Sequence, residues 1–144
     1  MKRYLNPKAR LYQIINKAEA GIILSGAEVK SVKTRGIQLG GAYVKIQEGE
    51  VFLVNAVIAP YSYAYQPDYD SGQTRKLLLG KKEISWLMTQ KKKKLTIIPL
   101  SCYTRHGWIK VQLGIGRLKK KHERKKELIR EEAEREMRNV LKRG

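Results

Sequence analysis

The side chains best suited to binding chemistry are concentrated in one basic stretch, residues 116–126, which reads Gly-Arg-Leu-Lys-Lys-Lys-His-Glu-Arg-Lys-Lys. Its lysines and arginines are suited to contacting phosphates. His122 differs from its neighbours because a planar imidazole can stack on a base. A solvated histidine in a lysine run is the simpler alternative. We therefore regard this stretch as a candidate nucleic-acid contact with one candidate stacking residue.

No catalytic constellation accompanies that stretch. His122 and Glu123 could form an acid/base pair, but adjacent residues in a helix point apart. The Gly-Ile-Gly at 114–116 lacks the rest of a dinucleotide fingerprint. Two histidines and one cysteine are too few and too scattered for a structural zinc site. Asp68 and Asp70 are explained more simply by a turn. We expect no enzyme activity, no metal and no cofactor.

The charge of the chain points to a polyanionic partner. The 144 residues include 31 basic and 13 acidic side chains, a net charge of +18. Residues 117–144 hold 12 of the basic and 6 of the acidic ones, so +12 falls on the preceding body. Such an excess repels itself unless a polyanion neutralises it, and nucleic acid is the leading candidate. A basic protein that is merely soluble is the bland alternative.

Cysteine usage and hydropathy exclude two further protein classes. A single cysteine, Cys102, rules out an internal disulfide framework, and its apolar neighbours indicate a buried thiol. The longest apolar runs are far shorter than the roughly 18 residues of a membrane span. We expect a cytoplasmic protein without a membrane partner, and a monomer.

The body, residues 1–116, reads as short strands and two short helices. Apolar periodicity predicts helices over residues 27–35 and 81–90. Strands are expected over residues 9–16, 20–24, 42–47, 51–58, 75–79, 95–104 and 108–115. We interpret the first two strands as a hairpin joined by Lys17-Ala18-Glu19, and the next two as a hairpin around Glu48-Gly49-Glu50. This pattern predicts a mainly β fold, a small, partly open antiparallel barrel of the oligonucleotide-binding (OB) kind. A two-sheet sandwich is the alternative.

A long loop over residues 59–72 carries four tyrosines, Tyr61, Tyr63, Tyr65 and Tyr69. Loops of this length inside a compact domain are usually functional or disordered. Exposed tyrosines near basic residues can stack on bases. An equally good interpretation is that some of them cover the edge of the core.

The tail, residues 117–144, has one long helical pattern from residue 121 to 143. Its apolar stripe is narrow, and isolated helices of this length are marginal in water. Favourable pairs such as Glu131 with Arg135 each contribute only about 0.2–0.5 kcal/mol. We therefore predict a basic tail that is disordered when free and helical when bound. A helix packed permanently on the body is the alternative.

Five ordered segments resemble the SsrA-binding protein family, also called small protein B. Leu5-Asn6-Pro7-Lys8-Ala9-Arg10 is similar to the family's opening. The most distinctive block is Glu19-Ala20-Gly21-Ile22-Ile23-Leu24-Ser25-Gly26-Ala27-Glu28-Val29-Lys30-Ser31. Ile58-Ala59-Pro60-Tyr61, Arg75-Lys76-Leu77-Leu78-Leu79 and Lys119-Lys120-Lys121-His122-Glu123-Arg124-Lys125 follow in the family's order. The sequence departs from the family at Ala27, Gly80 and Leu118, and Glu123-Arg124-Lys125 stands where the family has Asp-Lys-Arg.

The resemblance implies a non-catalytic adaptor with an OB-type barrel. Its partners would be transfer-messenger RNA, whose alanyl-tRNA-like acceptor arm the barrel binds, and the small-subunit rRNA of stalled ribosomes. Positions matching the family's RNA-contacting residues are Asn6, Glu19 and Leu78, to which we add Tyr61, Arg75 and Lys76 from the loop and the strand after it. The stretch expected in the decoding centre and the empty mRNA channel comprises Lys119, Lys120, Lys121, His122, Glu123, Arg124, Lys125 and Lys126.

Two other functions remain open from the sequence. A general ribosome-associated or single-stranded RNA-binding protein with an OB fold would share the same charge and barrel. An RNA-processing enzyme would have to use His122, His106 and the loop carboxylates, and the scarcity of paired acid and base groups argues against it.

Overall fold

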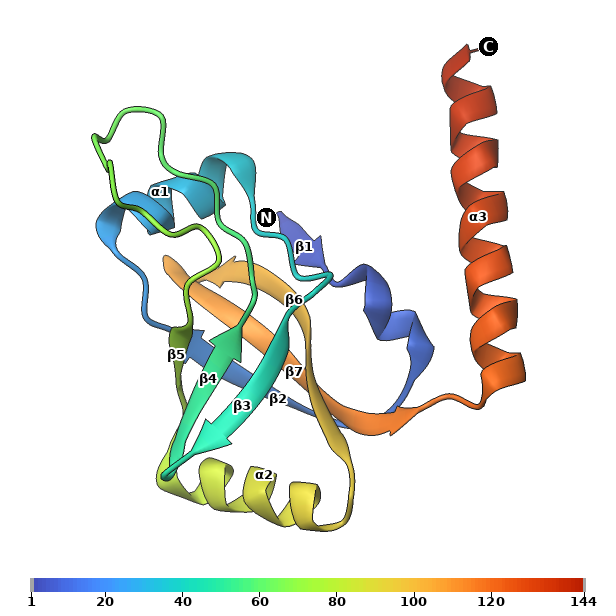
Figure 1. The fold of residues 1–144 in the computed structure, drawn as a ribbon, viewed down its shortest axis with the longest axis horizontal. Helices are drawn as coiled ribbons and strands as arrows, with labels where there is room; N and C mark the ends of the chain where they lie inside the picture. Colours follow the sequence, from blue (N-terminus) through green and yellow to red (C-terminus); the bar gives the residue numbers. More distant parts are fainter. Residues whose placement is uncertain (1, 144) are drawn as a thin grey trace.

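A curled antiparallel sheet forms the body of the protein (Figure 1). The computed structural model describes residues 2–143. The strands are β1 (Arg3–Leu5), β2 (Tyr12–Ile22), β3 (Tyr43–Gln47), β4 (Glu50–Val54), β5 (Arg75–Leu78), β6 (Thr96–Arg105) and β7 (Trp108–Leu118). Their order in the sheet is β1-β6-β7-β2-β5-β4-β3, and every neighbouring pair is antiparallel. Within the described residues no ladder joins β1 to β3, so the predicted mainly β, antiparallel fold is confirmed with an open sheet.

The helices are α1 (Gly26–Arg35), α2 (Lys81–Lys92) and α3 (Lys121–Arg143), and a 3-10 helix, η1 (Pro7–Leu11), precedes β2. α1 begins at a capping box, in which Ser25 and Glu28 satisfy each other's backbone N–H groups, and it ends at Gly36, whose φ is +91°. Both helices predicted in the body are therefore present, and α2 continues two residues beyond its predicted end. α1 and α2 lie at opposite ends of the curled sheet (Figure 1).

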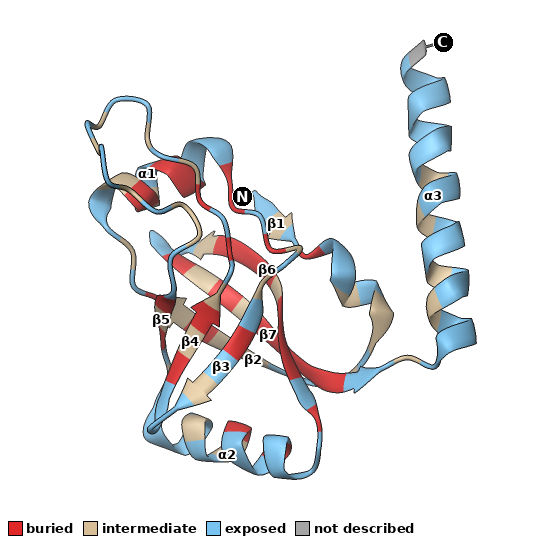
Figure 2. Cartoon of the chain, in the orientation of Figure 1, coloured by how far each residue is buried: buried red, intermediate tan, exposed pale blue. Residues whose placement is uncertain are grey.

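The core lies inside the curl of the sheet, where the strands turn one row of side chains inward (Figure 2). Its fully buried members include Val51, Leu53, Val111, Leu113 and Ile115, and Leu87 adds a contact from α2. Cys102 is part of this core, and burial raises the pKa of its thiol to about 12. The predicted burial of this thiol is thus confirmed.

The first predicted hairpin is wrong. Residues 7–11 form η1, because Asn6 caps its start and Pro7 fits a first helical position. The following residues form a single strand, β2, which pairs with β7 along nearly its whole length. Lys17, Ala18 and Glu19, which were expected to form the turn, instead pair with residues 114, 113 and 112 of β7. This places Glu19 in the middle of the sheet.

The other predicted turns are present, for a conformational reason. Glu48 and Gly49 both have positive φ, as the tight β3–β4 hairpin requires, and His106 and Gly107 do the same between β6 and β7. β4 ends earlier than predicted, at Val54, because Asn55 takes a φ of +64° and interrupts the strand. The short edge strand β1 was not predicted. It pairs with β6 through three residues.

The sheet ends at the joint between body and tail. β7 continues through Leu118, two residues past the expected boundary, and α3 begins at Lys121. A Cβ on Gly116 would lie 2.0 Å from the carbonyl oxygen of Gln13, so only glycine lets β7 approach β2 this closely. The joint therefore starts from a fixed point on the sheet.

Candidate nucleic-acid interface

Four strands, β6, β7, β2 and β5, present a continuous surface on the side of the sheet away from the core. Ala20, Ile22, Leu77 and Val111 point inward, so the residues that alternate with them point outward. We call this surface the outer face. Its members are Arg3, Lys17, Glu19, Gly21, Lys76, Leu78, Tyr103, Arg105, Trp108, Lys110 and Gln112.

The register brings two of the predicted RNA-contacting residues together. Gly21 pairs with Leu78 on one side and with Lys110 on the other, and Glu19 is two residues before Gly21 on the same strand. Leu78 is 51% exposed although it belongs to a central part of the sheet. Glu19 and Leu78, 59 positions apart in the sequence, therefore share one surface.

Glu19 is held by two donors from β6. The hydroxyl of Tyr103 and Nη1 of Arg105, the latter at 3.0 Å, both donate to Oε2 of its carboxylate. The guanidinium of Arg3 lies 4.2 Å from the centre of the Tyr103 ring. The hydrogen bond from Tyr103, together with Arg105, lowers the pKa of Glu19 from its ordinary value of 4.5, so the carboxylate is charged at neutral pH. Burial, reinforced by Glu19, raises the pKa of Tyr103 to about 12.

Two hollows lie along these strands, and Glu19 lines the first of them. The first is polar and is lined by Arg3, Lys17, Ala18, Glu19, Tyr103, Arg105 and Gln112. The second is more apolar, and the exposed side chains of Ile23, Leu78 and Trp108 border it. Gly21 separates Leu78 from Lys110 in this second hollow, since a Cβ there would lie 3.4 Å from Cβ of Leu78 and 3.8 Å from Lys110 Nζ. Cations beside an exposed indole suit phosphates and bases together.

Two other predicted contact residues lie inside the protein. Asn6 is buried, where its Oδ1 accepts from the backbone N–H of Lys8 at 2.9 Å and its Nδ2 donates to the carbonyl of Pro99 at 2.7 Å. It joins η1 to β6. Arg75 has a side chain only 2% exposed, and its Nη2 lies 2.8 Å from Oε2 of Glu28. Neither side chain belongs to the exposed outer face.

Arg75 is the centre of a buried cluster that secures the long loop. Its guanidinium also donates to the carbonyl oxygens of Ala56, Ser71 and Gln73, at 2.7, 2.9 and 3.0 Å. The Tyr69 hydroxyl, with its single proton to donate, lies 3.0 Å from Oε2 of Glu28 and 2.9 Å from the carbonyl oxygen of Ile58. In this structure Arg75 has a structural role: it ties the two ends of the loop to α1.

The loop tyrosines divide into two groups. Tyr69 is built into the Arg75 cluster, whereas Tyr63 and Tyr65 are 89% and 93% exposed. Tyr61 is intermediate: its ring centre lies 5.6 Å from that of Tyr63 and 5.7 Å from Lys30 Nζ. The loop lies beside α1 (Figure 1), in agreement with the contact between Tyr61 and Lys30 of that helix. Lys76, on β5, pairs at the surface with Glu50 at 3.3 Å.

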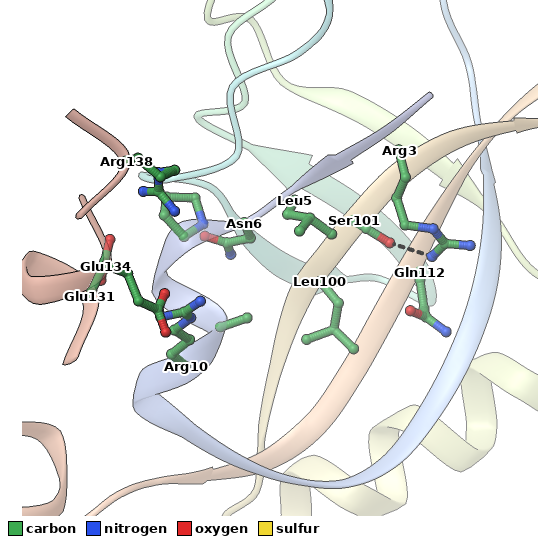
Figure 3. A pocket seen from close by; sticks show the side chains of 12 residues that line it. Arg3, Leu5, Asn6, Arg10, Leu100, Ser101, Gln112, Glu131, Glu134 and Arg138 are labelled. Carbon is green, nitrogen blue, oxygen red and sulfur yellow. Dashed lines mark hydrogen bonds and ion pairs between the residues drawn. The ribbon is translucent and has the colours of Figure 1, made fainter. Parts of the chain in front are cut away.

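The tail stands beside η1 as a continuous helix, nearly all of it exposed (Figure 2). Arg10 Nη1 lies 3.0 Å from Oε2 of Glu134, and Lys119 Nζ lies 3.3 Å from Oε1 of Glu127. Figure 3 shows the hollow between the two elements, with Arg10 directed toward Glu134. The helix thus meets the body through charged side chains, which at a surface contribute little stability.

The apolar stripe of α3 remains uncovered in this arrangement. Ile129, Met137 and Val140 are each about 60% exposed, and Leu141 is 73% exposed. His122 is 69% exposed, and its Nε2 lies 3.9 Å from Oε1 of Glu123, beyond hydrogen-bonding distance. All of the predicted contact residues from Lys119 to Lys126 lie on the joint or on the first turns of α3. The joint and α3 form a second candidate surface, separate from the outer face.

The described part of the chain has neither a group of metal-ligating side chains nor a helix able to span a membrane. Residues 2–143 contain no group of three or more histidine, cysteine, aspartate or glutamate side chains placed to hold a metal ion. Among the same residues, no helix is both long and apolar enough to cross a membrane.

Sequence reasoning missed several members of the outer face, namely Arg3, Lys17, Tyr103, Arg105, Trp108 and Lys110. A signal for some of them was present. Trp108, Lys110 and Gln112 alternate with the buried Ile109, Val111 and Leu113, which is the pattern of a strand with one polar face. The diagonal contact of Tyr103 with Glu19 carries no such signal, because it depends on the register of three strands.

Comparisons with known proteins agree over nearly the whole chain. Residues 4–143 match the family model described as SmpB protein. An SsrA-binding protein of Microcystis aeruginosa is 42% identical over 141 residues, which cover 96% of this chain and 92% of the relative. An SsrA-binding protein of Chlamydia caviae is 41% identical, covering 96% and 93%. A solved chain from "tmRNA-SmpB: a journey to the center of the bacterial ribosome" is 34% identical with a TM-score of 0.69, covering 89% of this chain and 95% of that one.

Proposed function

This chain belongs to the SmpB family of SsrA-binding proteins, and from that premise we propose that it is a non-catalytic adaptor for transfer-messenger RNA in ribosome rescue. In this role it binds the tRNA-like part of that RNA and brings it to stalled ribosomes. The observation that carries the proposal is the presence of two separate candidate surfaces: the outer face of the sheet, and the basic joint with α3.

The outer face is the surface proposed for the tRNA-like acceptor arm. Lys17, Arg105 and Lys110 supply cations for phosphates, and Leu78 and Trp108 supply apolar and aromatic area for riboses and bases. Glu19 repels phosphate, so it serves as an acceptor for hydrogen-bond donors of the RNA. Tyr61, on the loop, is a further proposed contact at the margin of the body.

The joint and α3 are the surface proposed for the ribosome. Lysines and arginines around His122 would neutralise rRNA phosphates without reading a sequence, and His122 would stack on a base in the decoding centre. α3 would then occupy the empty mRNA channel. The ion pair between Arg10 of η1 and Glu134 of α3 is exposed, so it adds little free energy to hold α3 beside the body.

A competition between RNAs tests the proposal. The body should bind a tRNA-like acceptor arm much more tightly than a duplex or an unstructured RNA of equal length. Equal affinities would favour the alternative, a general ribosome-associated or single-stranded RNA-binding protein. Incubation of labelled RNA with the protein and divalent ions tests the enzymatic alternative, and clean turnover would favour it. We expect the chain to act as a monomer in the cytoplasm, where ribosomes are.

A further inference from the structure

The carboxylate of Glu19 is asymmetrically bonded. Tyr103 and Arg105 both donate to Oε2, and no side chain or backbone group of the described residues donates to Oε1. A carboxylate has two oxygens with about two acceptor sites each, so Oε2 is fully used and Oε1 remains open. Glu19 borders a hollow whose other polar lining is Tyr103, which bonds to Oε2, and the cationic or amide side chains of Arg3, Lys17, Arg105 and Gln112.

Tyr103 is unusually well placed to fix this arrangement. Its side chain is buried, with 6% of the residue exposed, although its hydroxyl reaches the outer face. Tyr103 pairs with Lys110 of β7. Its side chain extends diagonally across β7, and its hydroxyl reaches Glu19 on β2. Arg3 of β1 lies over its ring. Two side chains of β6 thus hold one carboxylate oxygen of β2, and a third side chain, from β1, covers the Tyr103 ring.

We propose that Tyr103, with Arg105, is a positioning residue that locks the Glu19 carboxylate so that Oε1 accepts a hydroxyl or amino donor of the bound RNA. The proposal rests on the proposed function, since it assumes that the outer face binds RNA. Without the lock, the Glu19 side chain would rotate among several rotamers, and binding RNA would have to restrict it again. With the lock, that cost is met during folding.

The lock also explains why a carboxylate can sit on a surface that binds a polyanion. Arg3, Lys17 and Arg105 neutralise the local charge, so phosphates on either side are not repelled. The remaining acceptor then discriminates, because it rejects a phosphate and accepts a donor such as a ribose hydroxyl or a base amino group. Tyr103 does not itself need to touch the RNA.

A double-mutant cycle tests the inference on the full-length protein with a tRNA-like acceptor-arm RNA. Tyr103→Phe should weaken binding about 5- to 10-fold, as expected for the loss of one charge-assisted hydrogen bond. In a Glu19→Ala background, the same substitution should have almost no further effect. The dependence of affinity on salt should be unchanged, because no charge is removed. Tyr65→Phe, at an exposed loop position, is the matched control and should bind like the unsubstituted protein.

The inference would be overturned if Tyr103→Phe bound the RNA like the unsubstituted protein. It would also be overturned if Tyr103→Phe lost as much affinity in the Glu19→Ala background as on its own, because Tyr103 would then contact the RNA directly. Should Tyr103→Phe fail to fold, Arg105→Gln removes the second donor from a side chain that is 58% exposed. Because Arg105 also supplies a cation for phosphate, only the part of its cost that disappears in the Glu19→Ala background reports on the lock. A 2′-deoxy acceptor arm identifies the donor: the cost of Glu19→Ala disappears if it is a ribose hydroxyl and persists if it is a base amino group. If the unsubstituted protein shows no preference for the acceptor arm, the proposed function itself fails.

Discussion

At the scale of single residues, some basic side chains are buried and stabilise the fold, whereas others are exposed and available to bind a partner. Arg75 is the clearest case. Its guanidinium is nearly inaccessible and is bonded to Glu28 and to three backbone carbonyl oxygens. Lys76, the next residue, points outward and pairs with Glu50 in solvent. Two adjacent basic residues of one strand therefore have opposite roles, decided by which face of the sheet each occupies.

Arg75→Ala should destabilise the protein by about 3–5 kcal/mol, because it leaves the Glu28 carboxylate buried without its cation. Lys76→Ala is the matched control. Its exposed ion pair should be worth less than about 1 kcal/mol. Urea unfolding of both variants measures the difference, and equal losses would contradict the buried cluster.

The lowered pKa of Glu28 predicts how the free energy of unfolding depends on pH. Burial raises the pKa of this carboxyl, but the backbone of Ser25 and the side chains of Arg75 and Gln73 outweigh it, so the folded pKa lies below 4.5. A carboxylate with a depressed pKa stabilises the fold above its unfolded pKa, and the contribution is lost as pH falls through the folded value. Unfolding measured from pH 7 downward should show stability falling below about pH 4.5. Glu28→Gln should flatten that fall and Glu50→Gln should not. Indistinguishable profiles would refute the assignment.

Gly21 is a residue-scale test of the outer face. A methyl group there would make ordinary contacts with Leu78 and Lys110, so Gly21→Ala should fold normally. It would also fill part of the apolar hollow, and acceptor-arm binding should weaken about 3- to 10-fold through lost close contact. Gly41→Ala, where a methyl group would meet nothing within 4 Å, is the control. Unchanged binding of Gly21→Ala in a gel-shift titration would place the RNA elsewhere.

At the scale of elements, the sequence predicted the helices and hairpins that are marked by a few neighbouring residues. The Ser25–Glu28 capping box and the Glu48-Gly49 turn identify α1 and the β3–β4 hairpin without knowledge of the rest of the chain. β2 could not be found in this way. Its middle, Lys17-Ala18-Glu19, is polar like a turn because Lys17 and Glu19 face outward, while the pairing with β7, about 95 residues later in the chain, keeps it extended.

The candidate site follows the same division. The basic joint and His122 are contiguous in sequence and could be recognised directly, and Glu19 and Leu78 were reached through a family resemblance. Tyr103 and Arg105 are defined by tertiary register, which no local pattern encodes. The burial of Arg75 could not be predicted, because an arginine beside a lysine at a strand start gives no sign of which one is buried.

α3 gives a prediction at the element scale. Its apolar stripe is uncovered and its contacts with the body are surface ion pairs, so tertiary packing adds little to a helix that is marginal alone. A peptide of residues 119–143 should show weak helicity by circular dichroism in plain buffer and gain helix on binding rRNA fragments. Strong helicity of the free peptide would contradict conditional folding.

At the scale of the whole molecule, the two surfaces divide the labour of an adaptor. The body carries a preformed face built on four strands, which suits recognition of a folded RNA. The tail, residues 117–144, carries 12 basic and 6 acidic residues, which suits a path lined by phosphate. The joint connects β7, which is fixed in the sheet, to α3, which meets the body through a surface ion pair. Each surface can therefore engage its own RNA.

Delivery of labelled transfer-messenger RNA to ribosomes stalled with an empty mRNA channel tests this division most directly. The full chain and a version ending at Leu118 are compared at concentrations where both have saturated the RNA. The two-surface account predicts that the shorter chain binds the RNA almost as tightly as the full chain yet fails to support its entry into the ribosome. Equal delivery by the shorter chain, or loss of RNA binding on truncation, would contradict it.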